Sequence, residues 1–384
     1  MIPYGRQSIN DDDIAAVTDV LKSDFLTQGQ QVPNFESAVS KYVGAEFATA
    51  VNSATSALHI ACIALGVGKG DHVWTSPISF VASANCALYC GANVDFVDID
   101  SQTFNLCPNA LHKKLEHHKR HNLPLPKVVI PVHLSGQVCD MKAIWQLANE
   151  YQFKIIEDAS HAIGARYSNN KVGACKFSDI TVFSFHPVKI ITSGEGGMAI
   201  TNHKPLDNAM KMLRSHGITR DTQLMNNTED PWYYEQQGLG FNYRMTDIQA
   251  ALGLSQLKRL DDFIFKRKNI AKQYHHSLSD LPITLPHQYS EQSSAWHLYI
   301  IQVNEVKRLS TFKQLRESGI GVNVHYIPIY FQPFYQALGF KQGLCPNAEA
   351  YYKTCISLPI YPELTNEEQT QVVNSLKAIL LEED

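Results

Sequence analysis

The sequence lacks the features that mark several large classes of protein. Only 18% of its 384 residues are charged, and 33 Lys and Arg stand against 37 Asp and Glu, so that no basic excess indicates nucleic-acid binding. No apolar run approaches the length of a membrane span, and the first residues (MIPYGR) lack the charged-then-apolar layout of a secretory signal. We therefore expect a cytoplasmic protein that binds neither nucleic acid nor membrane.

Metal and nucleotide fingerprints are also missing. The eight cysteines are scattered, without the paired Cys-x-x-Cys spacing of a zinc site. The chain has no Walker motif, no glycine-rich dinucleotide motif and no internal repeat. We expect reduced thiols and no metal.

What the chain does contain is a regular alternation of short apolar runs and helix-length amphipathic segments. The runs are residues 72–75, 94–97, 127–132, 153–156, 180–183 and 198–201. This alternation predicts an α/β fold with a mostly parallel sheet between helices. After about residue 245 long helices and then a shorter alternation follow, which indicates a second unit. We predict a large domain over residues 1–250 and a smaller C-terminal α/β domain over residues 251–384.

Polar segments follow several of these runs directly. They are residues 75–80, 133–136, 158–161 and 184–189. Because functional residues of such sheets collect at the carboxyl ends of the strands, we expect these segments to converge.

Lys189 stands in one of them, on a short loop that contains Pro187 and leads to the glycine-rich turn 194–197 (GEGG). A lysine that attacks a carbonyl group needs a pKa lowered by burial or by a neighbouring cation. Taken alone, Lys189 is better interpreted as an ordinary lysine of a solvent-exposed loop, and the other components of the site are needed to favour a reactive amine.

Three further components fall at predicted strand ends. Residues 52–58 (NSATSAL) open a helix, and the free N–H groups and hydroxyls of such a first turn suit a phosphate group. The residues expected to form this phosphate seat are Ala54, Thr55, Ser56 and Ser184. Phe80 offers a flat side chain, and Asp158 closes a buried strand.

Together with Lys189, these components match the requirements of pyridoxal phosphate. Its aldehyde needs a lysine, and its ring nitrogen needs a carboxylate. Its phosphate group needs hydroxyls and the free amides of a helix start, and the face of its ring needs a flat side chain to stack on. The sequence therefore predicts pyridoxal 5'-phosphate as the cofactor, with Lys189 and Asp158 as catalytic residues.

Four segments resemble the DegT/DnrJ/StrS family of sugar aminotransferases. They are residues 157–165 (EDASHAIGA), 184–189 (SFHPVK), 194–197 (GEGG) and 240–251 (GFNYRMTDIQAA). They stand in the order of the family, and the resemblance extends from about Pro3 to the C-terminus. It implies a PLP-dependent transferase of fold type I. One departure is Ala54-Thr55, where many relatives have Gly-Thr.

The resemblance also implies roles for the cofactor residues. Lys189 would bond to the cofactor and move the proton between the substrate carbon and C4′. Asp158 would pair with the ring nitrogen, and Phe80 would stack on the ring. The phosphate would be held by Ala54, Thr55 and Ser184.

The resemblance implies cofactor contacts for two further residues. His161 would lie close to the ring, although it could instead be a buried histidine that only orients Asp158. The asparagine that matches Asn242 reaches the phosphate of the neighbouring subunit's cofactor in the family, which implies a homodimer with shared active sites.

Within the family the chain is most similar to the members that aminate a sugar nucleotide for pseudaminic acid synthesis. The segments that suggest this are 23–29, 52–58, 75–85, 184–189 and 324–330. The implied reaction moves the amino group of glutamate to the C4 keto group of a UDP-linked 4-keto-6-deoxy-N-acetylhexosamine.

The substrate contacts implied by this similarity come from both ends of the chain. They are Tyr4, Asp24, Phe25, Leu26, Thr27, Ala54, Ser184, His325 and Tyr326. Core packing is the competing interpretation for Tyr4 and Tyr326.

Other functions stay open at this stage. The substrate could be another nucleotide-linked keto-sugar, such as those of the perosamine and bacillosamine pathways. A sugar 3-dehydratase of the same family would have a histidine in place of Lys189. A non-catalytic regulator with this fold would be expected to lose Lys189 or Asp158, and both are present.

Overall fold

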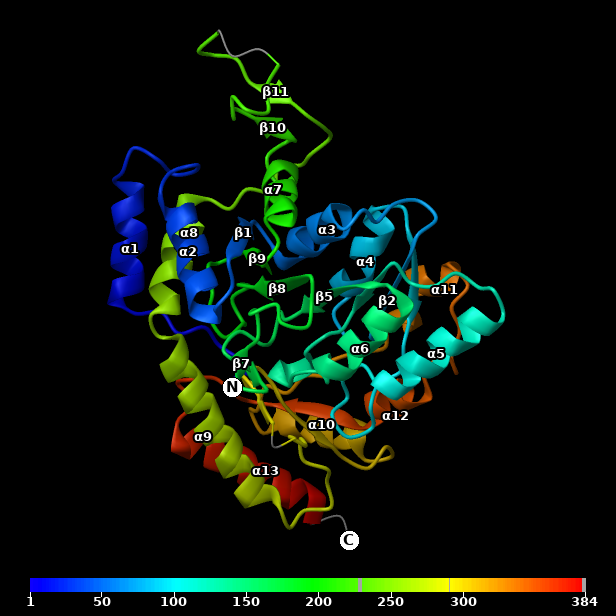
Figure 1. Ribbon diagram of the computed structural model, residues 1–384. Coiled ribbons are helices and arrows are strands. Elements are labelled where there is room, and N and C mark those ends of the chain that lie inside the picture. The colour runs from blue at the N-terminus through cyan, green and yellow to red at the C-terminus, as the bar shows by residue number, and fades with distance from the viewer. Residues whose placement is uncertain (227–229, 290, 382–384) are drawn as a thin grey trace.

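The computed structural model describes residues 1–226, 230–289 and 291–381. Its centre is a seven-stranded sheet of order β1-β9-β8-β5-β4-β2-β3 (Figure 1). The strands are β1 (Phe47–Val51), β2 (His72–Thr75), β3 (Asn93–Phe96), β4 (Val128–Ile130), β5 (Lys154–Asp158), β8 (Ile180–Ser184) and β9 (Gly197–Thr201). Strands β3, β2, β4, β5 and β8 are parallel, and β9 is antiparallel to both of its neighbours. The predicted mostly parallel sheet is therefore confirmed.

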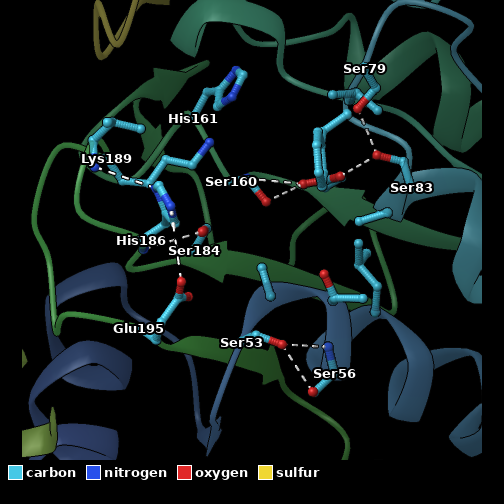
Figure 2. Close-up of a pocket in the computed structure, with 18 of the residues that line it drawn as sticks. Ser53, Ser56, Ser79, Ser83, Ser160, His161, Ser184, His186, Lys189 and Glu195 are labelled. Carbon is cyan, nitrogen blue, oxygen red and sulfur yellow. Dashed lines mark hydrogen bonds and ion pairs between the residues drawn. The ribbon is translucent and has the colours of Figure 1, made fainter. Parts of the chain in front are cut away.

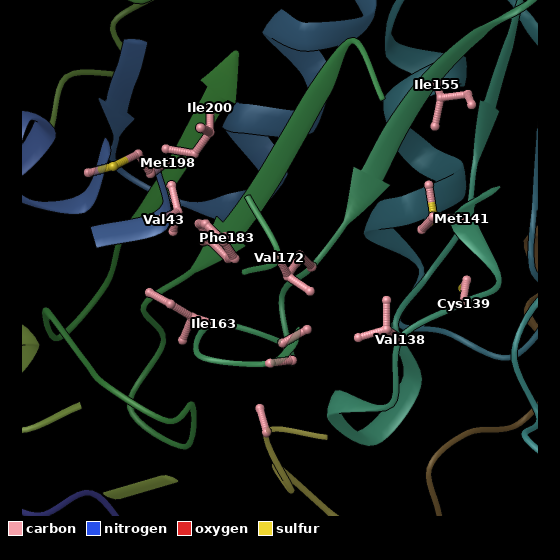
Figure 3. Packing of buried hydrophobic residues seen from close by; sticks show 14 of the residues in the cluster. Val43, Val138, Cys139, Met141, Ile155, Ile163, Val172, Phe183, Met198 and Ile200 are labelled. Atoms are coloured by element: carbon pink, nitrogen blue, oxygen red, sulfur yellow. The ribbon is translucent and has the colours of Figure 1, made fainter. Parts of the chain in front are cut away.

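The sheet is buried on both faces because its strands carry apolar side chains in both directions. In β8, Ile180 and Val182 join one core cluster, whereas Phe183 joins the cluster on the other face. Figure 3 shows the latter cluster, in which Phe183, Met198 and Ile200 of the sheet pack near Val43 of helix α2. Both faces are thus closed to water, which leaves the ends of the strands for function.

Helices cover the two faces. The side chains of the cluster around Phe183 come from α2 (Gln31–Val43), α5 (Pro108–Arg120), α6 (Met141–Tyr151) and α8 (Asp247–Leu257). The opposite cluster is built with α3 (Ala54–Ala64), α4 (Ala82–Tyr89), α7 (Lys204–Leu213), α11 (Pro333–Ala337) and α12 (Pro346–Thr354). Helix α1 (Asp11–Leu21) packs against α8 and begins at a capping box formed by Asn10 and Asp13.

The C-terminal part has a core of its own. Strands β13 (Tyr299–Gln302) and β14 (Cys355–Leu358) pair antiparallel, and α9 (Leu260–Leu278), α10 (Arg308–Glu317) and α13 (Asn366–Leu381) pack around them. Ile2 joins this core, because its N–H donates to the carbonyl of Gly319 at 2.8 Å. Helix α8 runs across residues 250 and 251, and the division of the chain at that point stays a prediction.

Short elements complete the structure. They are β6 (Arg166–Tyr167), β7 (Asn170–Lys171), β12 (Gln292–Ser293), β10 (Ile218–Thr219), β11 (Glu235–Gln236), η1 (Leu134–Gly136) and η2 (Ile329–Phe331). The β10-β11 pair projects beyond the body of the molecule at the top of Figure 1. None of the helices in the described residues is long and apolar enough to cross a membrane.

Candidate active site

A cavity of about 810 Å³ lies where the carboxyl ends of β5 and β8 meet the start of α3 (Figure 2). Most of the predicted site residues line it, although they come from distant parts of the chain. Those that do are Tyr4, Ala54, Thr55, Ser56, Phe80, Asp158, His161, Ser184, Lys189, His325 and Tyr326. Of the segments expected to converge, 75–80, 158–161 and 184–189 contribute to the lining of this cavity, whereas residues 133–136 do not.

Lys189 extends into this cavity from the loop that follows β8. The loop is held by the N–H of Lys189, which donates to the carbonyl of His186 at 2.9 Å. Burial lowers the pKa of the Lys189 amine to about 8, against the opposing attraction of the Asp158 carboxylate. A substantial fraction of the amine is then neutral near pH 8 and can act as a nucleophile or base.

Asp158 ends β5 and is 4% exposed. Ser83 donates from its hydroxyl to Oδ2 at 2.6 Å, and Ser160 donates to Oδ1 from its hydroxyl at 2.6 Å and its N–H at 3.1 Å. The hydroxyl oxygen of Ser79 lies 2.7 Å from that of Ser83 and extends the hydrogen-bond network. Three bonds thus fix the direction of the carboxylate, as a partner for a cationic ring nitrogen requires.

The start of α3 forms the phosphate seat. Ser53 caps the helix, since its hydroxyl accepts from the N–H of Ser56 at 3.1 Å. A Cβ atom added to Gly197 of β9 would collide with the backbone nitrogen of Ala54 and the carbonyl group of Ser53. The glycine therefore lets β9 pass close to the first turn of α3. Residues of this turn line the cavity, and the positive end of the helix dipole lies there.

Ser184 and Phe80 lie on other sides of the same cavity. Ser184 is the last residue of β8 and is 7% exposed. Phe80 follows β2 and is 63% exposed, so that one face of its ring is available to a flat ligand.

His161 does not orient Asp158, which is bonded instead to Ser83 and Ser160. The Nδ1 atom of His161 accepts from the N–H of Ser135 at 3.2 Å, and its Nε2 atom lies 3.3 Å from the hydroxyl of Tyr326. Burial, together with the charges of Lys189 and His325, lowers the pKa of His161 well below its ordinary value. The ring is therefore neutral at physiological pH.

Tyr4 and Tyr326 both line the cavity and pack against the core on that side of the sheet. The ring of Tyr4 lies 5.3 Å from that of His325, whose Nδ1 atom lies 2.8 Å from the hydroxyl of Ser357. Burial and the charge of Lys189 lower the pKa of His325 to about 4. The two interpretations of these tyrosines, packing and substrate contact, are thus compatible.

Five predicted residues lie outside the cavity. They are Asp24, Phe25, Leu26, Thr27 and Asn242. The segment that contains the first four is held near the start of α8, where the N–H of Asp247 donates to the carbonyl of Leu26 at 3.0 Å. Asn242 is exposed and pairs with Ser215 in an isolated bridge. This one chain does not bring them to the site.

Sequence reasoning missed several residues of the cavity. Those are Asn52, Ser53, Ser79, Ser83, Ser160, His186, Glu195 and Gln249. Ser160 had a signal, because serine two residues after an aspartate commonly bonds back to it. Ser83 had none, since it reaches Asp158 only through the packing of α4 against the sheet.

The sequence matches a known family along most of its length. The model of the DegT/DnrJ/EryC1/StrS aminotransferase family covers residues 7–377. The chain belongs to this family. The resemblance found in the motifs is thereby confirmed, and the chain is an enzyme, an aminotransferase of nucleotide-linked keto-sugars. The regulator and dehydratase interpretations are set aside.

Individual proteins are similar to nearly the whole chain. A UDP-4-amino-4,6-dideoxy-N-acetyl-beta-L-altrosamine transaminase from Campylobacter jejuni is 38% identical over 99% of this chain and 98% of its own. The structure of Helicobacter pylori PseC, an aminotransferase involved in the biosynthesis of pseudoaminic acid, is 32% identical, with a TM-score of 0.90 and 99% of each chain covered.

A third similar protein gives information on the cofactor. The putative sugar aminotransferase Spr1654 from Streptococcus pneumoniae, solved in a PMP form, is 29% identical, with a TM-score of 0.91 and 100% of each chain covered. The cofactor of the protein described here is pyridoxal 5'-phosphate. The donor set fits it: Lys189, the fixed carboxylate of Asp158 and the helix start above Gly197 offer the groups that it needs.

Proposed function

We propose that this aminotransferase moves the amino group of glutamate to the C4 keto group of a UDP-linked 4-keto-6-deoxy-N-acetylhexosamine. The sugar expected from the sequence is UDP-2-acetamido-2,6-dideoxy-beta-L-arabino-hex-4-ulose, and the product would be a UDP-4-amino-4,6-dideoxy sugar for pseudaminic acid synthesis. The names of the Campylobacter and Helicobacter relatives support this choice.

The observation that carries the proposal is the placement of Lys189 in the cavity with Asp158. When bound, pyridoxal phosphate supplies an electron sink for the negative charge left when a proton is removed from carbon. The neutral Lys189 amine can accept that proton and deliver it to C4 of the sugar, since burial brings its pKa to about 8. Asp158, fixed by Ser83 and Ser160, would keep the ring nitrogen protonated.

The other cofactor residues would bind and orient. The N–H groups of Ala54 and Thr55, with the hydroxyls of Thr55 and Ser184, would hold the phosphate, and Phe80 would cover one face of the ring. His161, neutral and buried, would lie beside them without adding charge.

We also propose a homodimer with shared active sites. The basic residues of the described cavity lining are Lys189 and the histidines 161, 186 and 325, against the acids Asp158 and Glu195. A cofactor phosphate, a nucleotide diphosphate and a glutamate together carry several negative charges. A partner subunit would supply further groups to the lining. The exposed Asn242, whose amide can donate a hydrogen bond to a phosphate, and the segment 24–27, which holds the exposed Phe25 and Leu26, would be available for contact with the partner's site.

Mixing two variants, each altered in a different component of the proposed shared site, tests whether the sites are shared. Lys189→Ala removes the amine from its own cavity, and Asn242→Ala alters the residue predicted to reach the partner's. After subunit exchange, a mixed dimer has one cavity with both residues intact, so that we expect part of the activity to return. No recovery, with exchange shown by differently tagged chains, would contradict shared sites.

A substrate panel tests the sugar. The enzyme with glutamate would be incubated with UDP-, dTDP- and GDP-linked keto-sugars, and the products analysed by NMR. We expect amination at C4 of the UDP-linked N-acetylated sugar. Preference for a perosamine or bacillosamine precursor would replace the proposed substrate while leaving the reaction class intact. A cytoplasmic location also stays a prediction.

A further inference from the structure

Three groups beside Lys189 form a chain of hydrogen bonds that the proposed reaction does not yet use. The backbone N–H of Ser135 points to Nδ1 of His161 at 3.2 Å, and Nε2 of His161 lies 3.3 Å from the hydroxyl of Tyr326. His161 is 5% exposed, and both it and Tyr326 line the cavity. These hydrogen bonds therefore link the backbone N–H of Ser135, whose direction is fixed, to a ligand bound in the cavity.

The direction of the first group is set by an unusual turn. Ser135 has φ 58° and ψ 6°, a left-handed conformation that is unfavourable for a residue other than glycine. The turn is held in place because the N–H of Leu298 donates to the carbonyl of Ser135 at 3.3 Å. A Cβ on the next residue, Gly136, would come within 2.9 Å of the carbonyl oxygen of His161 and the nitrogen of Trp296. The turn cannot rotate its N–H away without disturbing this packing.

The Ser135 bond fixes the tautomer of His161. A backbone N–H can only donate, so Nδ1 must accept and cannot carry a proton. Because burial and the charges of Lys189 and His325 lower the pKa of His161 well below its ordinary value, the ring is neutral and has one proton, on Nε2. The ring of His297, also buried, packs against His161 at 4.4 Å between centroids and supports its orientation.

The tautomer in turn decides what Tyr326 does. Nε2–H donates to the Tyr326 oxygen, so the hydroxyl proton of Tyr326 must point to a different acceptor. Burial raises the pKa of Tyr326, which keeps that proton on the oxygen. Since Tyr326 lines the cavity, its O–H is available to a bound ligand.

The position of this donor indicates which ligand it serves. Figure 2 shows His161 at the opposite side of the cavity from Ser53 and Ser56, which mark the phosphate seat, with Ser184 between them. Resting on the proposed function, in which Tyr326 is already a predicted substrate contact, we propose that His161 is a positioning residue. Its tautomer, fixed by the N–H of Ser135, directs the Tyr326 hydroxyl to donate to an oxygen of the keto-sugar. An acceptor sugar without an oxygen at that point would leave the donor unpaired and be disfavoured.

The first test needs neither cofactor nor substrate. The imidazole nitrogens of His161 can be observed by ¹⁵N NMR in the full-length, cofactor-free enzyme, with assignment from the signals lost in His161→Asn. We expect a proton on Nε2 and a bare Nδ1 throughout pH 6 to 8. A proton on Nδ1, or a charged ring in that range, overturns the proposal whatever the substrate is.

The second test separates the two substrates. Tyr326→Phe removes only the hydroxyl, and single-turnover absorbance measurements follow the glutamate and sugar half-reactions separately. We expect the sugar half-reaction to slow by about 10-fold, from the loss of one buried hydrogen bond, and to fall more than the glutamate half-reaction. Equal losses in both, or none, would overturn the assignment to the sugar.

Two His161 variants test positioning. The amide of His161→Gln can place an N–H near the Nε2 position and keep the bond to Tyr326, whereas His161→Asn is too short to reach. We expect His161→Gln to retain a faster sugar half-reaction than His161→Asn. In the Tyr326→Phe background, His161→Asn should slow the sugar half-reaction little further. Equal loss in both variants, or fully additive effects, contradicts a role through Tyr326. If the wild-type enzyme aminates none of the sugars, the proposed function fails while the tautomer result stands.

Discussion

The inner and outer parts of the site differ in how completely one chain builds them. Around Lys189 the groups are buried, bonded to one another and held by strand ends and by the start of α3. By contrast, Phe25, Leu26 and Asn242 are exposed and lie outside the cavity. One chain therefore brings Lys189, Asp158 and the start of α3 together, whereas the predicted roles of Asn242 and of residues 24–27 depend on the proposed second subunit.

The largest effect should come from the inner part. Lys189→Ala removes the only lysine of the described cavity lining, and with it the group that moves the proton. We expect amino transfer to fall by about 100-fold or more, the range typical of a lost acid-base group. Lys268→Ala, on the exposed side of α9, serves as the control. Transfer at the wild-type rate by Lys189→Ala would remove the basis of the mechanism.

Asp158→Asn should have the next largest effect. The change keeps the shape but removes the charge that faces the ring nitrogen, and it turns one acceptor of Ser83 or Ser160 into a donor. A lost buried charge partner costs about 3 kcal/mol or more, so that turnover should fall by about 100-fold. Ser83→Ala should cost less, about 10-fold, because two bonds from Ser160 remain. If the serine change were as damaging as the Asp158 change, geometry rather than charge would be the main contribution of Asp158.

Gly197→Ala tests the phosphate seat. The added methyl group would displace the first turn of α3 from β9, and such overpacking costs about 1–3 kcal/mol. We expect weaker binding of pyridoxal phosphate, measured by equilibrium dialysis, and a lower Tm. Gly194→Ala is the matched control, since nothing lies within 4 Å of its added methyl group, although its own φ of +81° adds some strain. Equal cofactor affinity in both variants would indicate that the seat lies elsewhere.

The inner part should also show a characteristic pH dependence. Burial lowers the pKa of Lys189 to about 8, so the neutral amine that reacts with the cofactor's aldehyde is lost as the pH falls below that value. In the cofactor-free enzyme, the rate of covalent attachment should rise with pH and level off above about pH 8. A rate that continues to rise towards pH 10 would mean that Lys189 has the pKa of an ordinary exposed lysine.

The outer part should respond more weakly and differently. Phe25→Ala leaves the bonds of the inner site intact, because Phe25 lies outside the cavity and is 61% exposed. We expect normal attachment of the cofactor and a KM for the keto-sugar raised by about 10-fold or less. A change in the cofactor spectrum instead would end the distinction between the two parts.

The sequence predicted residues at the ends of strands better than residues that reach the site through tertiary packing. The sheet followed from the runs of buried residues, since β2 was predicted at its observed bounds and the other runs differed by a few residues. Asp158 and Ser184 were found because each stands at the end of a strand, and Lys189 because it stands on the short loop that follows one. Ser83 and the N–H of Ser135 could not be found in this way, because they reach the site through tertiary packing and an unusual turn.

The resemblance supplied what local patterns could not. Asn242 and the segment 24–27 carry no local chemical signal, and the chain alone leaves them outside the cavity. Their roles stay predictions that rest on the family and on the proposed dimer.

Transfer of ¹⁵N from labelled glutamate tests the central claim most directly. The wild-type enzyme, loaded with pyridoxal phosphate, would be incubated with ¹⁵N-glutamate and the UDP-linked 4-keto sugar, and the product examined by NMR for coupling between nitrogen and carbon. We predict that the label is bonded to C4 and is absent with Lys189→Ala. Label at C3, or no label in the sugar while 2-oxoglutarate accumulates, would contradict the proposed reaction.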